Sequence, residues 1–269
     1  MLYDNRANVL ATLVVLGLVL AAGLTLPAWS REVMVLGSPL TISVTQTTMI
    51  ALLLTGIVCA GTDTVIRLHP RARQVDGSFS FVTWTVPALT TALAAVLLPE
   101  LPSLAYRGAG YVLTGLLLIL LISAEYVTID PADRRYPAAR FLLNAWAYLL
   151  ALAAFVLIYS LRSRSLVSAT AVTVAGALLA LDLLRGAGQG FGRTALYALI
   201  AGLSTGQVIW AMNYMRLGGV SGGLVLLFSF YIATGVAGQT LQGELNRRLL
   251  LEYAAVALAG LLVLLIWGT

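Results

Sequence analysis

Ionisable residues are rare in this sequence, and several acids recur with an Arg at a fixed spacing. Four apolar segments end with an Asp or Glu that is followed by an Arg three or four residues later. Side chains at this spacing share one face of a helix and can form an ion pair, and an Arg near a helix C-terminus is also favoured by the helix dipole. The pairs either stabilise helix ends or surround a polar vestibule. They are Asp63 and Arg67, Asp130 and Arg134, Asp182 and Arg185, and Glu244 and Arg248.

Glu125 lies deeper in its apolar segment than these acids do. It stands in Ile122-Ser-Ala-Glu-Tyr-Val, about one and a half helical turns inside the expected helix end. Ionisable groups at such depth are costly in a membrane and are usually functional or paired. Arg140 and Asn144, at the start of the next helix, are its expected partners. A packing role, with Glu125 hydrogen-bonded to Tyr126 or Asn144, is the alternative.

A third group of polar residues lies in the segment Thr194–Met215. Ser204 and Gln207 fall on roughly one helix face, and Gly202 and Gly206 form a small-xxx-small step that permits close helix approach. Such polar residues either join helices or bind a ligand. Together, the predicted ligand-binding residues are Glu125, Asn144, Arg140, Asp63, Asp182 and Gln207, and no catalytic or metal-binding residue is assigned.

Several chemistries lack the residues they need. The sequence has one histidine (His69), one cysteine (Cys59) and no lysine, so we expect no metal site, no cofactor and no lysine Schiff base. Gly219-Val-Ser-Gly-Gly matches the G-x-S-x-G pattern of serine nucleophiles, but His69, its only candidate base, is expected on the other side of the membrane. We therefore expect these glycines to form a tight turn, and an enzyme is the less favoured class.

The elements that position these residues are apolar runs of about twenty residues, the length a helix needs to cross a bilayer. With 60% apolar and 10% charged residues, the chain has too few charges for a soluble fold. We predict an all-α polytopic transmembrane helix bundle of about nine helices, with residues 1–269 as a single domain and no soluble domain; eight helices is the alternative count. The expected spans are Asn8–Leu26, Thr45–Ile66, Phe81–Leu98, Ala109–Ile129, Phe141–Ser160, Leu166–Leu184, Thr194–Met215, Val220–Leu241 and Leu249–Trp267.

The distribution of arginines predicts the orientation of these spans. Eleven of the sixteen cationic residues fall in the amino-terminal tail and the even-numbered loops, and five in the odd-numbered loops. Because positive loops stay inside, the amino terminus is expected in the cytoplasm and the carboxyl terminus outside. The same bias accounts for the net charge of +5, so nucleic acid is not an expected partner. In the first outer loop, Ala28–Ile42, the string Glu32-Val-Met-Val-Leu-Gly-Ser-Pro-Leu alternates loosely and could form a short hairpin on the outer surface.

Three strings carry a resemblance to a known family: Gly61-Thr-Asp-Thr-Val-Ile-Arg-Leu-His-Pro, Trp84-Thr-Val-Pro-Ala-Leu and Leu251-Glu-Tyr. They resemble an uncharacterised family of bacterial polytopic integral membrane proteins without an assigned activity, which implies the inner (plasma) membrane of a bacterium. Nine helices also resemble the architecture of intramembrane prenyltransferases. In that family aspartate-rich motifs after helices two and six hold magnesium; Asp63 and Asp182 stand at those places, but the clustered further aspartates are missing.

Three functions follow as hypotheses. The first is a protein that binds or carries a small or lipophilic ligand through a cytoplasm-facing polar cavity around Glu125. The second is a structural or assembly subunit of a larger membrane complex. The third is an intramembrane lipid-modifying, prenyltransferase-like enzyme. The expected partners are the lipid bilayer and, for the subunit hypothesis, other membrane proteins or further copies of the chain.

Overall fold

The computed structural model describes residues 2–21, 23–25, 27–35, 38–72, 81–215, 217–244, 246 and 251–255. The chain divides into two compact units, Met1–Arg140 and Phe141–Thr269. Helix α5, Tyr136–Ser160, begins in the first unit and continues in the second. The expectation of a single domain over residues 1–269 stays a prediction.

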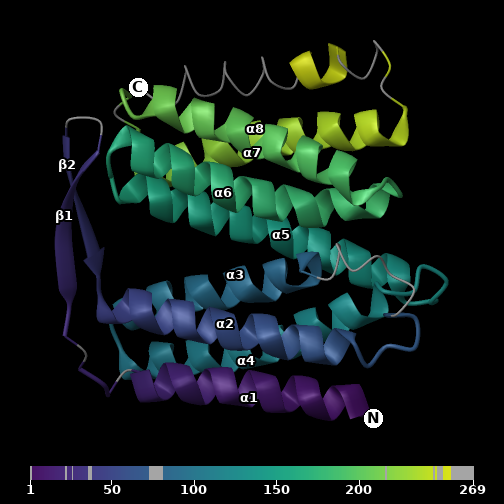
Figure 1. The fold of residues 1–269 in the computed structure, drawn as a ribbon, viewed down its shortest axis with the longest axis horizontal. Coiled ribbons are helices and arrows are strands. Elements are labelled where there is room, and N and C mark those ends of the chain that lie inside the picture. Colours follow the sequence, from purple (N-terminus) through teal and green to yellow (C-terminus); the bar gives the residue numbers. More distant parts are fainter. Residues whose placement is uncertain are drawn as a thin grey trace. The chain divides into compact units, whose positions relative to one another are not determined.

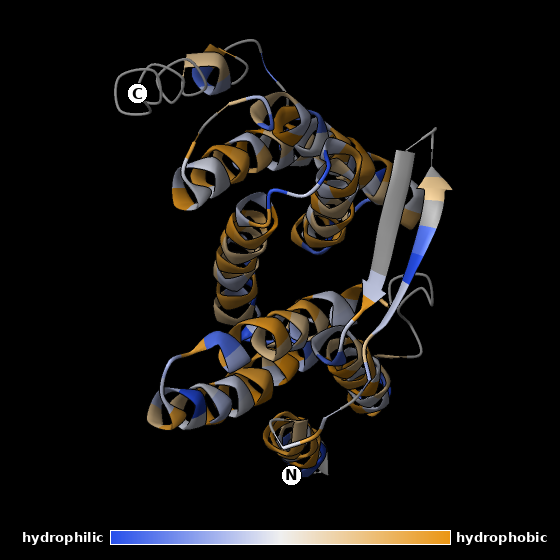
Figure 2. Ribbon diagram, turned by 90° about the vertical axis from the view of Figure 1, so that its left-hand side faces the viewer, coloured by the Kyte–Doolittle hydropathy of each residue, from blue (hydrophilic) through white to orange (hydrophobic). Residues whose placement is uncertain are grey.

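The part of the chain that is described is almost entirely helical (Figure 1). Seven of its helices are long and apolar enough to cross a membrane, and α1 adds a shorter apolar helix. Hydrophobic residues cover these helices, while the most hydrophilic ones gather near helix ends and in the hairpin (Figure 2). The predicted fold class, a polytopic transmembrane helix bundle, is thereby confirmed. The elements are α1 (Leu2–Ala21), β1 (Trp29–Val35), β2 (Ser38–Val44), α2 (Gln46–Ile66), α3 (Val82–Leu97), η3 (Leu98–Glu100), α4 (Leu104–Val127), α5 (Tyr136–Ser160), α6 (Ser165–Leu184), η4 (Arg185–Ala187), α7 (Phe191–Met212) and α8 (Gly219–Gln242).

The predicted spans correspond to α1–α8, with shifts of a few residues at their ends. The largest shift is in the first helix, which begins at Leu2 rather than at Asn8 and ends at Ala21 rather than at Leu26. The predicted ninth span, Leu249–Trp267, lies outside the described residues except for 251–255, which are helical.

Side-chain caps explain where two of the spans begin. Thr45 precedes α2, and its hydroxyl accepts a hydrogen bond from the Thr48 amide at 3.3 Å. Ser103 precedes α4 and accepts one from the Tyr106 amide at 3.2 Å. Such caps satisfy amides that have no partner within the helix. At the other end of the chain, α8 stops at Gly243, whose φ of 75° is typical of a glycine that ends a helix.

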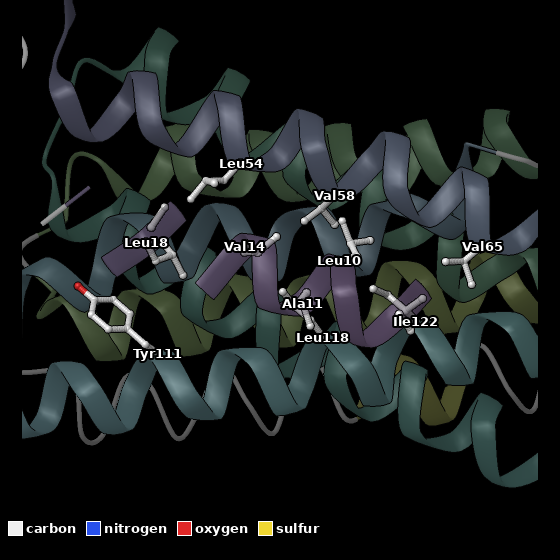
Figure 3. Packing of buried hydrophobic residues seen from close by; sticks show 12 residues of the cluster. Leu10, Ala11, Val14, Leu18, Leu54, Val58, Val65, Tyr111, Leu118 and Ile122 are labelled. Atoms are coloured by element: carbon white, nitrogen blue, oxygen red, sulfur yellow. The ribbon is translucent and has the colours of Figure 1, made fainter. Parts of the chain in front are cut away.

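The first unit is built around α1, which contacts both α2 and α4, while α3 packs on the same two helices. Leu10, Val14 and Leu18 of α1 form the centre of its aliphatic core (Figure 3). Their spacing of four residues places them on one helix face. Leu118 of α4 and Val58 of α2 are fully buried against them. In a bilayer this packing acts mainly through van der Waals contact, because lipid tails are as apolar as leucine.

The connection between α1 and α2 is a β-hairpin. β1 pairs antiparallel with β2, with Trp29 opposite Val44 and Val35 opposite Ser38. The predicted hairpin is confirmed, and its strands extend beyond the string Glu32–Leu40 on both sides, to Trp29 and Val44. Trp29 and Met34 are exposed on it. Its position on the outer membrane surface stays a prediction.

In the second unit the most extensive contact joins α6 and α7. A Cβ atom placed on Gly202 of α7 would lie 2.5 Å from the carbonyl oxygen of Thr173 in α6. A Cβ atom placed on Gly206 would lie 3.0 Å from the carbonyl oxygen of Ala169, also in α6. The close approach predicted from Gly202 and Gly206 is therefore confirmed.

The glycines of Gly219-Val-Ser-Gly-Gly do not form a turn, so that expectation was wrong. They form the first helical residues of α8. A Cβ atom on Gly222 would lie 2.2 Å from the ring of Tyr159 in α5, and one on Gly223 would lie 2.2 Å from the side chain of Val156. The physical reason for these glycines is thus close packing of α8 on α5.

Contacts between connections establish how the helices alternate in each unit. Arg71, after α2, pairs with Asp130, after α4, so these two connections share one end of the first unit. In the second unit Arg162, after α5, donates to the carbonyl oxygens of Met215 (3.4 Å) and Leu217, between α7 and α8. The seventh connection is therefore a true turn between two spans. Which end faces the cytoplasm stays a prediction.

Candidate functional site

Glu125 lies on the face of α4 that packs into the core of the first unit. Leu118 and Ile122 precede it on that face, and all three side chains are 0% exposed. The 3.6-residue period of the helix explains this placement, because residues at i, i+4 and i+7 share one stripe. Thr128 caps the helix just beyond and donates to the carbonyl oxygen of Glu125 at 2.9 Å. An acid thus occupies a core position on the same face as two aliphatic residues, which agrees with the depth predicted from the sequence.

Two ion pairs lie at the same end of the first unit. Asp63 accepts a hydrogen bond from Arg67 Nε at 2.5 Å, so the predicted i,i+4 pair is confirmed. The Arg67 side chain is 70% exposed, and hydrogen bonding to Asp63 raises its pKa above the ordinary value. Exposed pairs of this kind contribute little to stability, because water and salt screen them.

The second pair corrects a prediction. Asp130 pairs with Arg71 of the preceding connection, not with Arg134. The reason is that α4 ends at Val127, so Asp130 lies in the following turn, where its Oδ1 also accepts a hydrogen bond from the amide of Ala132 at 2.9 Å. The pair therefore joins two connections instead of closing one helix.

The acid near the end of α6 behaves as predicted. Asp182 Oδ1 lies 3.1 Å from Arg185 Nε, and the two side chains are 0% and 12% exposed. This is the most deeply buried of the ion pairs described. For the fourth predicted pair, Glu244 ends the described stretch after α8, while Arg248 lies outside the described residues.

Arg140 and Asn144, the expected partners of Glu125, both lie near the start of α5. One polar atom of each residue is buried: Arg140 Nη1 and Asn144 Oδ1 have almost no exposed surface. The same holds for Glu125 Oε1 on α4. Arg140 closes the first unit, whereas Asn144 belongs to the second. Contacts of Glu125 with these two residues stay predictions.

Gln207, the last of the predicted ligand-binding residues, lies on an exposed face of its helix. It is exposed on α7, between Leu203 and Trp210, which are both 46% exposed. Its neighbour Ser204 donates to the carbonyl oxygen of Ile200 in its own helix at 2.8 Å. Helix-joining polar contact comes instead from Asn213, whose Nδ2 donates to Ser168 Oγ of α6 at 2.9 Å.

A feature that the sequence did not reveal is a groove of about 800 Å³ in the second unit. Faces of α7 and α8 form most of it, with Ile200, Ser204 and Val208 of α7 opposite α8, and Ala254 of the helical segment 251–255 also lines it. Its remaining lining is Tyr197, Ala201, Val225, Phe228, Ser229, Ile232, Ala233, Val236, Ala237 and Thr240. The periodicity of each helix predicts which residues share a face. It does not predict which two faces lie opposite each other.

The groove is apolar in effect, although it contains hydroxyl groups. Ser204 donates to the carbonyl oxygen of Ile200, and Thr240 donates to that of Val236 at 2.7 Å, so these two hydroxyls are satisfied within their own helices. Tyr197 and Ser229 also line the groove. The contents of the groove therefore meet mainly methyl and aromatic surface. Among the residues that the structure describes, no three His, Cys, Asp or Glu side chains are grouped to hold a metal ion.

Comparison with known proteins identifies one family that matches this chain. The model of a family described as a protein of unknown function (DUF5656) matches residues 26–268. Because the match covers most of the chain, the chain belongs to the DUF5656 family. This agrees with the predicted resemblance to an uncharacterised family. No curated protein and no solved structure matches the chain.

Proposed function

We propose that this member of the DUF5656 family binds a lipophilic ligand, and that a single hydrocarbon chain occupies the groove between α7 and α8. The groove itself carries the proposal. Its volume of about 800 Å³ falls within the range of roughly 300–1,000 Å³ usual for ligand sites. It is far larger than the small voids left by ordinary core packing.

The expected position of the groove within the membrane favours a hydrocarbon chain over a polar solute. Both of its walls belong to helices long enough to cross the membrane, so the groove lies along the hydrocarbon layer. Val208 and Val225 lie in one part of it, and Tyr197 and Val236 in another, so it follows the length of the two helices. A chain-like ligand, such as an acyl or isoprenoid chain, matches that direction.

The polar residues that the sequence predicted to bind the ligand do not line this groove. Glu125, with Arg140 and Asn144, was expected to line a cytoplasm-facing cavity. The buried Glu125 carboxylate is compatible with a functional role, because buried acids in membranes are costly. Transport across the membrane, and a polar cavity at Glu125, stay predictions from the sequence.

An assembly role is the second candidate, and Gln207 favours it. A neutral amide within the apolar face of Leu203 and Trp210 gains when a neighbouring helix offers a hydrogen-bond partner. A second membrane protein, or another copy of the chain, could supply that partner.

The enzyme hypothesis has the least support. Asp63 and Asp182 each pair with an Arg one turn further along the chain. Magnesium bound to a diphosphate needs grouped carboxylates that are not already neutralised.

Native mass spectrometry of protein purified gently from its own membrane tests the proposal. Wild type should retain a lipid-class mass, and Ala233→Trp, which fills the groove from α8, should lose it. Leu224→Trp is the matched control, because Leu224 is exposed on α8 and outside the groove lining. Equal retention by a folded Ala233→Trp protein would exclude the groove as the site.

The same measurement on Glu125→Gln and Gln207→Leu separates the alternatives. Loss of the bound mass in Glu125→Gln would place the ligand in the first unit instead. A protein partner that copurifies with wild type and is lost only in Gln207→Leu would indicate the assembly role.

A further inference from the structure

A second cavity lies in the first unit, at the end of its helices away from the Arg71–Asp130 pair. It has a volume of about 160 Å³ and is lined by residues from α1, α2, α3 and α4 and by Pro99. That volume is large enough for several water molecules or a small anion. Its polar lining residues are Gln46, Thr47, Arg107 and Tyr111.

Arg107 gives this cavity its charge. Its Nε donates to the carbonyl oxygen of Leu101 at 2.9 Å, which fixes the guanidinium against the turn before α4. No ion pair with a carboxylate is found for it in the described ranges. Glu100 is the acid nearest to it in sequence, but this residue is exposed and does not line the cavity. The remaining N–H groups of Arg107 can therefore donate to a bound anion.

Tyr111 provides a second and independent observation. Its side chain is 7% exposed and lines the cavity. Figure 3 shows it at the edge of the aliphatic cluster, with its hydroxyl directed away from the other side chains. No hydrogen bond of this hydroxyl is found within the described part of the chain. The ring is fixed in the core, and its hydroxyl can therefore donate to a ligand in the cavity.

Helix ends add to the positive character of the cavity. α2 begins at Gln46 and α4 at Leu104, so two helix amino termini lie at this end of the unit. Their partial positive charge favours anions. Two carbonyl groups at and just after the end of α1 are already occupied, because Gln46 Nε2 donates to the carbonyl oxygens of Ala21 at 3.0 Å and Leu24 at 2.6 Å.

We propose that this cavity binds a phosphate group through Arg107 and Tyr111. Two transmembrane helices begin here, so the cavity lies at the level of lipid headgroups, where phosphates are abundant. Arginine matches the geometry of phosphate oxygens with two parallel N–H donors. The phosphate belongs either to a lipid headgroup or to a soluble phosphate. This inference does not depend on the groove between α7 and α8.

Two probes distinguish these sources in a phosphate-free maltoside detergent. Inorganic phosphate is titrated by calorimetry, and retention of phosphatidylglycerol is followed by native mass spectrometry. The variants are Arg107→Gln and Tyr111→Phe, with Arg6→Gln as a control for net charge, because Arg6 is exposed in the same unit. We expect binding of at least one probe to weaken tenfold or more in Arg107→Gln, and less in Tyr111→Phe.

The outcomes are distinct. Binding of phosphatidylglycerol alone supports a lipid headgroup, and binding of inorganic phosphate supports a soluble anion. The proposal is overturned if neither probe prefers wild type to Arg107→Gln, or if Arg6→Gln weakens binding equally. Tyr111→Phe keeps the aromatic ring in the core, so it tests the hydroxyl even if Arg107→Gln fails to fold. Retention of the groove ligand in these variants separates this proposal from the function proposed above.

Discussion

The two units hold their helices together by different means. In the first unit, leucine and valine side chains of α1, α2 and α4 fill the space between helices. Even its close glycine contacts meet side chains: a Cβ atom on Gly17 would lie 2.5 Å from the Leu54 methyl group. In the second unit, Gly202 brings the backbones of α6 and α7 together, with 2.5 Å left between an added Cβ atom and the Thr173 carbonyl oxygen.

This difference bears on where each unit can bind a ligand. The core of the first unit is filled by long side chains, and the cavity described for this unit lies at the helix ends. A backbone contact on one side of α7 leaves its other side to face α8, where the large groove lies. The first unit, packed through side chains, therefore has a small polar cavity. The second unit, where backbones make close contact, has a long apolar groove.

The side-chain packing of the first unit is tested most severely by Leu118→Ala. Leu118 is fully buried, so the substitution leaves a cavity among α1, α2 and α4. We expect a loss of about 3 kcal/mol in the free energy of unfolding, within the lower half of the range for buried leucines. The cavity term persists in a membrane, whereas the transfer from water contributes less. The measurement is denaturant unfolding in detergent.

Leu116→Ala is the matched control on the same helix, because Leu116 is 61% exposed. It should change the unfolding free energy by less than about 0.5 kcal/mol. An equal loss in the two variants would mean that the core of the first unit is not packed as described.

Gly202→Ala tests the backbone contact of the second unit. The added methyl group meets the Thr173 carbonyl and the Ala177 amide at 2.5 and 2.7 Å, and backbone atoms cannot move aside alone. We expect a loss of about 1–2 kcal/mol. Gly17→Ala is the comparison in the first unit: its methyl group meets a side-chain end that can rotate, and alanine favours the helix. Thermal unfolding should show a clearly lower midpoint for Gly202→Ala than for Gly17→Ala; the reverse order would contradict the comparison.

The sequence predicted the helices well because each span is limited by features within it. Runs of apolar residues define the spans, and Thr45 and Ser103 cap them locally. The small-xxx-small step at Gly202 also identified a real helix contact. These are short-range properties, and the 3.6-residue period is enough to derive them.

The sites were harder to predict because they depend on which faces meet. Arg107 and Tyr111 are four residues apart and share a face of α4, but nothing in the sequence indicates that this face meets Gln46, since four helices must come together to form the cavity. The same limit applies to Asp130, which was expected to pair with Arg134 nearby but pairs with Arg71 of another connection. Gly222 is a further case, because its role depends on the ring of Tyr159.

A difference in pH response is the smallest effect expected between the units. The only histidine of the chain, His69, lies in the first unit. Its ring packs edge-on against Tyr126 at 4.7 Å, and its Nδ1 accepts a hydrogen bond from the Arg71 amide at 3.1 Å. Partial burial lowers the pKa of His69 below its ordinary value of 6.5; Asp130 and Asp133 oppose this shift, and the charge of Arg71 adds to it.

The sign of the stability effect follows from this direction. Because the folded protein binds the proton less readily than the unfolded chain, the contribution of His69 to stability is complete above pH 6.5. It decreases as the pH falls through 6.5 towards the pKa of the folded state. Arg71→Ala should raise the pKa of His69, and Asp130→Asn should lower it further. NMR titration of the single imidazole measures both directly. If Arg71→Ala left the pKa unchanged, the charge of Arg71 would not act on the ring, and burial alone would account for the pH response of the first unit.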